Sequence, residues 1–208
     1  MPGITSTGQV ISPKALAHVV FRTADLDRMV DFWVTSLGGS ISHRSKAIAF
    51  IRYDEEHHRI AIIQAPGTVE RNPQAAGMHH VAFSFDTLSE LVEGYHQRKA
   101  HSIVPKRCVN HGPTTSMYYE DPDGNTIETQ VDNFDTADEA AEFMSSKLFA
   151  ENPIGTDFEP EDLVARLKAG EDDKIIKKRI EIGPRGLPAS YGPQENSPMF
   201  HGRRSTGT

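Results

Sequence analysis

Cysteine is nearly absent from this chain: its 208 residues include only Cys108. A single cysteine cannot form a disulfide within the chain, so the sequence is consistent with a reducing compartment. Cys108 lies three residues before His111, which raises the question of a nucleophilic thiol. We expect an inert thiol instead, because the cysteine follows a basic pair and no second cysteine accompanies it.

Long apolar runs are also missing. No stretch approaches the run of about 20 apolar residues that a membrane-spanning helix requires, and MPGITSTGQVISPK has no apolar core of signal-peptide length. Positive charge is not in excess, since 22 Lys and Arg face 29 Asp and Glu. The net charge of -7 argues against a nucleic-acid surface, and the short basic stretch KIIKKR is expected to be solvated. We therefore predict a cytoplasmic protein that binds neither nucleic acid nor a membrane.

The most informative feature that is present is an internal repeat. The segment AHVVF, which contains His18, matches HHVAF, which contains His80, and a capped helical pattern follows each. Further on, FIRYDEEHHRIA lies without gaps over MYYEDPDGNTIE, so that Ala61 falls on Glu128. Such self-similarity indicates one supersecondary unit that occurs twice.

The first copy predicts a strand over residues 16–22, followed by a helix that Thr23 or Asp25 caps and a Gly-Gly pair ends. Two further strands, over residues 48–53 and 59–64, form a hairpin around the turn DEEHH. The apolar stripe of the helix consists of Leu26, Met29, Val30, Trp33, Val34 and Leu37.

The second copy repeats this order. A strand over residues 78–85 leads into a capping box, in which Thr87 and Glu90 satisfy free backbone amides at a helix start. The two β-α-β-β-β units predict one α+β domain over residues 15–132, with modules at about 15–65 and 77–132. The remaining strands of the second copy are expected near residues 102–105, 116–120 and 126–131.

The flanking segments differ from this domain. Residues 1–14 form a polar leader, and residues 133–170 are expected to form a helical extension. Residues 171–208 are a charged tail, rich in Gly and Pro and expected to be partly disordered. The extension has too few apolar residues for its own core, so we predict that it packs on the domain or pairs with a second subunit in a homo-oligomer. One helix of the extension begins at the capping box Thr136/Glu139 and carries Ala140, Phe143, Met144 and Leu148; the other opens at Pro160 and runs through Leu163, Val164 and Leu167 to Gly170.

A divalent cation requires neutral imidazoles and carboxylates that converge from different strands. His18, His80 and Glu128 meet this requirement, because the repeat places the histidines at matched positions and the glutamate on an adjoining strand. These donors suit Fe(II) or Mn(II). Either histidine alone would more readily be interpreted as a core histidine with its hydrogen bonds satisfied, but the matched positions in the repeat favour a metal site. His79 competes with His80, but neighbouring side chains of a strand point to opposite faces, so we expect His79 to face away.

Other polar residues are expected to have structural roles. Asp121 begins the sequence DPDGN, which is typical of a tight turn that sets Glu128 in register. Tyr119 should pack in the core, on the strand face opposite Tyr118. His57 and the neighbouring His58 lie in the charged turn DEEHH and are predicted to be at the surface.

The segments LAHVVFRTADLDRMVDFWVTSLGG, GMHHVAFSFDTLSELV and HGPTTSMYYEDPDGNTIE resemble the vicinal oxygen chelate superfamily. The resemblance covers residues 15–132, and ENPIGTDFEPEDLVARL is similar to the C-terminal extension of single-domain members. It implies a fold of tandem βαβββ modules, a fold that glyoxalases, epimerases, thiol transferases and drug-binding proteins share.

His-Gly, a later tyrosine and DPDGNxIE together resemble type I extradiol dioxygenases of the catechol 2,3-dioxygenase kind. The resemblance implies that His111 is an acid/base group, that Tyr118 hydrogen-bonds a substrate oxygen, and that Glu128 binds iron. His111 and Tyr118 are closer in sequence than in many two-domain enzymes of this kind and match the shorter relatives.

The resemblance also bears on the class of reaction. Glyoxalase-like members commonly take a fourth metal ligand from the position that is Ala61 here, and alanine cannot bind a metal. Three protein ligands leave room for two substrate oxygens and O2, so we predict an Fe(II)-dependent extradiol dioxygenase acting on a catechol-like aromatic diol. The alternatives are a metal-dependent isomerase, epimerase or lyase of the glyoxalase type and a non-catalytic protein that binds a small molecule.

Overall fold

The computed structural model describes residues 10–186, which group into two compact units. The first unit comprises residues 10–83, 93–106 and 118–129, and the second comprises the remaining described segments. These units do not follow the predicted modules, whose boundaries stay predictions. Parts of the predicted leader and of the predicted disordered tail lie outside the described residues. No helix within residues 10–186 is both long and apolar enough to cross a membrane.

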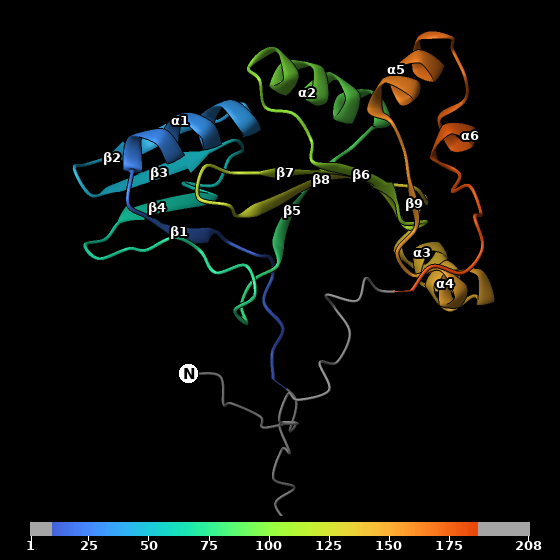
Figure 1. Cartoon of the computed structure of the whole chain (residues 1–208), viewed down its shortest axis with the longest axis horizontal. Coiled ribbons are helices and arrows are strands. Elements are labelled where there is room, and N and C mark those ends of the chain that lie inside the picture. Colours follow the sequence, from blue (N-terminus) through green and yellow to red (C-terminus); the bar gives the residue numbers. More distant parts are fainter. Residues whose placement is uncertain (1–9, 187–208) are drawn as a thin grey trace, which may run out of the picture. The chain divides into compact units, whose positions relative to one another are not determined.

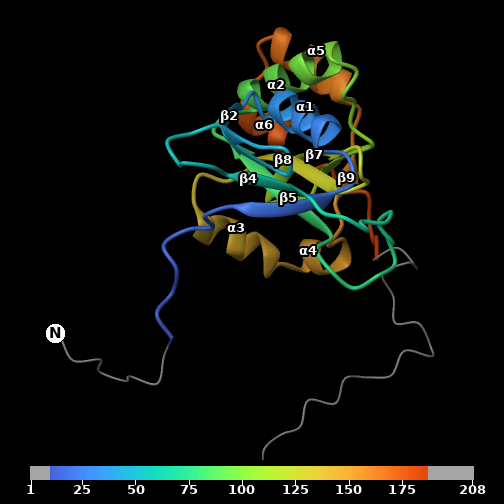
Figure 2. The same cartoon turned by 90° about the vertical axis from the view of Figure 1, so that its left-hand side faces the viewer.

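The first sheet has four strands in the order β1-β4-β3-β2 (Figure 1). Strand β1 runs parallel to β4 (Figure 2), whereas β3 pairs antiparallel with both β4 and β2. This is the predicted βαβββ order, and the predicted strands of the first copy are confirmed to within a few residues. The elements are β1 (Val19–Thr23), α1 (Leu26–Leu37), β2 (Ser40–Arg44), β3 (Ile48–Arg52) and β4 (Ile60–Gln64).

Helix α1 forms where its caps and its apolar stripe predict. The side chain of Asp25 accepts a hydrogen bond from the backbone amide of Arg28 at 3.1 Å, and Gly38 ends the helix in the left-handed region at φ 60°. The apolar face packs on β3 and β4, with Trp33 fully buried and its ring 4.7 Å from that of Phe21. One face of this sheet is thereby covered by α1 (Figure 1).

The sequence patterns predict no strand over the residues of β2. All five of its residues are exposed, so the sequence SISHR shows no burial alternation that would distinguish it from a loop. Its pairing with β3 also contains a bulge between Ile41 and His43. Only the pairing with β3 reveals that this segment is an edge strand.

The second sheet has the order β5-β8-β7-β6-β9, and its helix begins at the predicted capping box. The backbone amide of Glu90 donates to the Thr87 hydroxyl and the backbone amide of Thr87 donates to the Glu90 carboxylate, both at 3.1 Å. The elements are β5 (His80–Phe85), α2 (Leu88–Ala100), β6 (Arg107–Asn110), β7 (Thr114–Glu120), β8 (Thr126–Asp132) and β9 (Thr156–Asp157).

The strand predicted near residues 102–105 is wrong, because the chain turns there and β6 begins at Arg107. Ser102 has a positive φ of 63°, and its backbone amide donates to the carbonyl of Lys99. Pro105 has no backbone N–H with which to extend a ladder. Apolar Ile103 and Val104 were misleading here, since Val104 is in fact exposed.

The predicted extension contains α3 (Ala137–Met144), α4 (Lys147–Glu151) and α5 (Pro160–Lys168), and α6 (Asp173–Lys177) lies in the predicted tail. Below, the extension denotes the described residues 133–186. The capping box of Thr136 and Glu139 is confirmed. However, the single helix predicted to reach Leu148 is broken, because the Ser146 hydroxyl accepts from the Phe149 amide and starts a new helix. Strand β9 pairs antiparallel with β6, so the extension contributes an edge strand to the second sheet.

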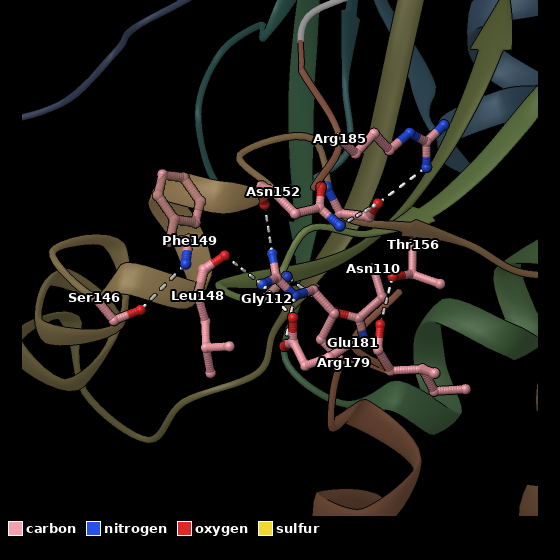
Figure 3. Close-up of polar contacts among 12 residues, drawn as sticks. Asn110, Gly112, Ser146, Leu148, Phe149, Asn152, Thr156, Arg179, Glu181 and Arg185 are labelled. Atoms are coloured by element: carbon pink, nitrogen blue, oxygen red, sulfur yellow. Dashed lines mark hydrogen bonds and ion pairs between the residues drawn. The ribbon is translucent and has the colours of Figure 1, made fainter. Parts of the chain in front are cut away.

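Arg179 binds the parts of the extension together (Figure 3). Its side chain is only 2% exposed, and its guanidinium donates to the carbonyls of Asn152 at 2.7 Å and Leu148 at 3.2 Å. It also pairs with Glu181 at 2.9 Å and stacks 5.0 Å from the Phe143 ring centre. The prediction of a solvated basic stretch is therefore wrong for Arg179, because its charge is matched by carbonyls that lie far away in sequence.

Candidate active site

His80, Glu128 and Tyr118 lie together in the first unit. Nε2 of His80 is 2.9 Å from Oε2 of Glu128, whose side chain is 6% exposed. This hydrogen bond to Glu128 raises the pKa of His80 above its ordinary value, against the opposing effect of burial. The Tyr118 ring stands edge-on to the His80 ring, with centres 5.6 Å apart. His80 therefore contacts both Glu128 and Tyr118, so three of the predicted site residues form one cluster.

The spacing of His80 and Glu128 fits a metal site. Two donors that bind one cation at neighbouring positions, each at about 2.1 Å, stand about 3 Å apart. The observed 2.9 Å between imidazole nitrogen and carboxylate oxygen meets this requirement. An imidazole together with a carboxylate is also the donor chemistry of non-haem Fe(II) sites. The pair can therefore supply two ligands to iron.

His18 lies just before β1 and contacts a different histidine. Its ring centre is 4.4 Å from that of His58. Within residues 10–186, no group of three or more His, Cys, Asp or Glu side chains is arranged to hold a metal ion. The structure therefore brings together two of the three predicted ligands, and the role of His18 stays a prediction.

The surface position predicted for His58 is wrong. The residue is 8% exposed, and its ring stacks on Phe50 with centres 4.5 Å apart and an interplanar angle of 15°. Burial lowers the pKa of His58, and His18 and His57 lower it further. The charged turn DEEHH concealed this burial, because the aromatic partner belongs to the preceding strand, β3.

The turn before Glu128 is confirmed as a structural element. The buried Asp121 carboxylate accepts from the backbone amides of Asp123 at 3.0 Å and Asn125 at 2.8 Å, and from the Asn125 side chain at 2.9 Å. Gly124 has a φ of 79°. Burial raises the pKa of Asp121. This network starts β8 and thereby sets the register of Glu128.

His111 belongs to the second unit, at the turn that follows β6. Its Nδ1 lies 2.6 Å from the carbonyl oxygen of Ile154, and a carbonyl can only accept, so Nδ1 carries a proton. In the neutral ring Nε2 is then the basic nitrogen. Arg179 donates to the His111 carbonyl at 3.3 Å, so the extension holds both the ring and the backbone of this residue. No sequence pattern indicates these contacts, because Ile154 and Arg179 lie 43 and 68 positions after His111.

The fold requires a glycine at the second position of the His-Gly motif. Gly112 has a φ of 99°, and a Cβ there would stand 2.1 Å from the Phe143 ring. Helix α3 of the extension therefore packs directly on the turn that contains His111. A side chain at this position would displace the helix.

With this geometry known, comparisons with known proteins identify the family. Residues 15–129 match the family described as the Glyoxalase/Bleomycin resistance protein/Dioxygenase superfamily. The chain belongs to this superfamily. It is 46% identical over 160 residues to biphenyl-2,3-diol 1,2-dioxygenase 2 of Rhodococcus globerulus, which covers 76% of this chain and 84% of that relative. It is 39% identical over 171 residues to biphenyl-2,3-diol 1,2-dioxygenase 3 of the same organism, covering 81% and 90%.

A relative of another activity lies further away. Lactoylglutathione lyase of Escherichia coli O157:H7 is 28% identical over 120 residues, which cover 54% of this chain and 89% of the lyase. In the present member of the superfamily, Ala61 is buried in β4 opposite Phe50 and offers no metal donor. The position that matches Glu128 in the repeat is thus part of the core.

Two residues that lie close in sequence to the predicted site residues have structural roles. Burial raises the pKa of Cys108 to about 12, so the thiol is protonated at neutral pH, in agreement with the expected inert role. Tyr119 is buried, and the Arg98 guanidinium lies 4.9 Å from its ring centre, which confirms the predicted packing role.

The prediction that His79 faces away from His80 is wrong. The two Nδ1 atoms lie 2.7 Å apart, with the rings at 83°. His79 precedes β5, where the alternation of a regular strand does not apply. Burial lowers the pKa of His79, and the neighbouring His80 and Arg71 lower it further.

Proposed function

We propose that this protein is an Fe(II)-dependent extradiol dioxygenase that opens the ring of a catechol-like aromatic diol beside its two hydroxyl groups. The observation that carries the proposal is the pairing of His80 with Glu128 beside Tyr118, in a chain 46% identical to a biphenyl-2,3-diol 1,2-dioxygenase. The relatives support a biphenyl-2,3-diol-like substrate, and Mn(II) is the alternative cation. A cytoplasmic location and a homo-oligomeric state stay predictions from the sequence.

His80 and Glu128 would hold the iron, with His18 as the third protein ligand. When bound, iron would supply the redox chemistry between the diol and O2. Both atoms of O2 enter the ring-opened product. The buried Glu128 carboxylate offsets part of the cation's charge. The absence of a donor at Ala61 leaves coordination positions for the substrate, in contrast to a site with four protein ligands.

Tyr118 is the group that would stabilise charge on the substrate. Its ring is half-buried and stands beside the His80 ring, so the phenol hydroxyl can donate a hydrogen bond to a diol oxygen near the ligand. A donor already held in place costs no reorganisation when charge develops on that oxygen. Tyr118 thus orients the diol and favours its ionised form.

His111 would move the proton. The resemblance to extradiol dioxygenases assigns this role to His111; since Nδ1 donates to the Ile154 carbonyl, Nε2 would be the atom that takes a proton from a substrate hydroxyl and returns it to an oxygen of the opening ring. The carbonyl of Ile154 also stabilises the protonated ring, because it accepts the Nδ1 proton in both charge states. The extension therefore contributes to acid/base chemistry through the orientation of His111.

Oxygen uptake tests this function. The protein is reconstituted with Fe(II) without oxygen and then exposed to O2 with catechol, 3-methylcatechol or 2,3-dihydroxybiphenyl. We expect uptake of one O2 per diol, with a product whose mass exceeds that of the diol by one O2. Bound iron without uptake on any diol would contradict the proposal. Isomerisation of a glutathione hemithioacetal by the same sample would instead support a lyase.

Replacing Tyr118 with phenylalanine should leave the iron content unchanged and lower kcat for diol cleavage by about 100- to 1,000-fold. The phenol oxygen is lost while the ring still packs against His80. Tyr53→Phe is the matched control, because Tyr53 is 43% exposed and should not alter kcat. Wild-type kcat in Tyr118→Phe would remove Tyr118 from the mechanism.

A further inference from the structure

Both ring nitrogens of His80 are engaged in the first unit. Nε2 faces Glu128 at 2.9 Å, and Nδ1 lies 2.7 Å from Nδ1 of His79. The second distance is that of a hydrogen bond, in which one of the two rings donates and the other accepts. His80 is thus held between a carboxylate on one side and an imidazole on the other.

A histidine that binds a metal through one nitrogen must carry its proton on the other. The partner of that second nitrogen decides the tautomer and the ring orientation. In His80 the nitrogen that faces Glu128 is Nε2, so Nδ1 is the atom whose protonation must be fixed. His79 is in contact with this atom.

We propose that His79 is a positioning residue that orients the His80 ring and holds it in the tautomer with the proton on Nδ1. The inference rests on the proposed metal-binding role of His80. When Nε2 directs its lone pair to a cation, Nδ1–H of His80 donates to the unprotonated Nδ1 of His79. Without a cation, the same pair can exchange roles, since a neutral imidazole has both a donor and an acceptor.

The backbone next to His79 is anchored to the turn that precedes Glu128. Arg71, in the linker between the two repeats, donates to the Met78 carbonyl and to the Gly124 carbonyl, each at 3.2 Å. One guanidinium therefore joins the residue before His79 to the turn that sets the register of Glu128. Because of this link, the backbone that carries His79 is fixed relative to the turn that precedes Glu128.

Metal affinity and the position of the proton test the inference without any diol. We compare His79→Ala with His79→Gln, whose amide can also accept a hydrogen bond. Binding of Co(II) is measured by titration, and the zinc-loaded protein with ¹⁵N-labelled histidine is examined by NMR for the Nδ1–H signal of His80. In His79→Ala we expect affinity to fall by about 10- to 100-fold and the Nδ1–H signal to be lost through exchange with water. His79→Gln should restore most of the affinity and the signal.

His101→Ala is the control, because His101 is an exposed histidine that follows α2 in the same unit. It should leave both measurements unchanged. Wild-type affinity together with an unchanged His80 signal in His79→Ala would overturn the inference. A loss that His79→Gln does not restore would also overturn it, because it would indicate a steric effect rather than a hydrogen bond. A wild-type protein that binds the metal and cleaves no diol would contradict the proposed function alone.

Discussion

Replacing Glu128 with alanine should release iron from the protein and lower diol cleavage by about 1,000-fold or more, equivalent to about 4 kcal/mol of transition-state stabilisation. Glu128 is the only carboxylate predicted to bind the metal, and its Oε2 lies 2.9 Å from Nε2 of His80, a second proposed ligand. Its loss removes both a ligand and a charge that offsets the cation. Iron content after gel filtration and the rate of oxygen uptake are the measurements.

Glu120→Ala is the matched control for this variant. Glu120 ends β7 as an exposed carboxylate, so its removal should change neither iron content nor rate. Glu128→Gln keeps the shape of the side chain without its charge, and we expect it to bind iron more weakly than the wild type. Full iron content in Glu128→Ala would show that this residue is not a ligand.

Arg179→Met should destabilise the extension by about 3 kcal/mol, because it leaves buried carbonyls without a donor. The guanidinium donates to the carbonyls of Asn152, Leu148 and His111 from a side chain that is 2% exposed. Methionine fills a similar volume, so the loss of hydrogen bonds is the main change. Urea unfolding measures the free energy, and limited proteolysis after residue 132 measures opening of the extension.

This variant should also lower activity, since Arg179 holds the backbone of His111. We expect kcat to fall more than iron content, because Arg179 holds His111, whereas the predicted metal ligands belong to the first unit. Lys147→Met is the control, because Lys147 is 90% exposed in α4 and forms a weak surface pair with Glu151. An Arg179→Met protein as stable as the wild type would show that the carbonyls find other donors.

Features that depend on neighbouring residues were predictable from the sequence. The capping boxes at Thr87 and Thr136 form as predicted, because each joins residues three positions apart. The turn at Asp121 forms for the same reason. The βαβββ order also followed from the sequence, since the repeat showed the same alternation of strand and helix patterns twice. Leu26, Met29, Val30 and Trp33 of the predicted α1 stripe are buried, because the stripe has the period of a helix.

Features that depend on distant partners were not predictable. Strand β2 has no buried residue and β9 is two residues long, so neither produces a periodic signal, and both exist only through pairing. Arg179 looked like part of a solvated basic stretch, and His58 like part of a charged turn. Their burial results from carbonyls and an aromatic ring supplied by other elements.

The sequence by itself determined the repeated unit, the superfamily resemblance and the identity of the candidate site residues, because these depend on residue type and on local spacing. The tertiary structure decided how those residues are held. It placed His80 between Glu128 and His79, and it set the tautomer of His111 through a carbonyl 43 positions further along the chain. The physical reason is that hydrogen bonds between side chains and distant backbone groups depend on chain packing, which spacing along the sequence does not contain.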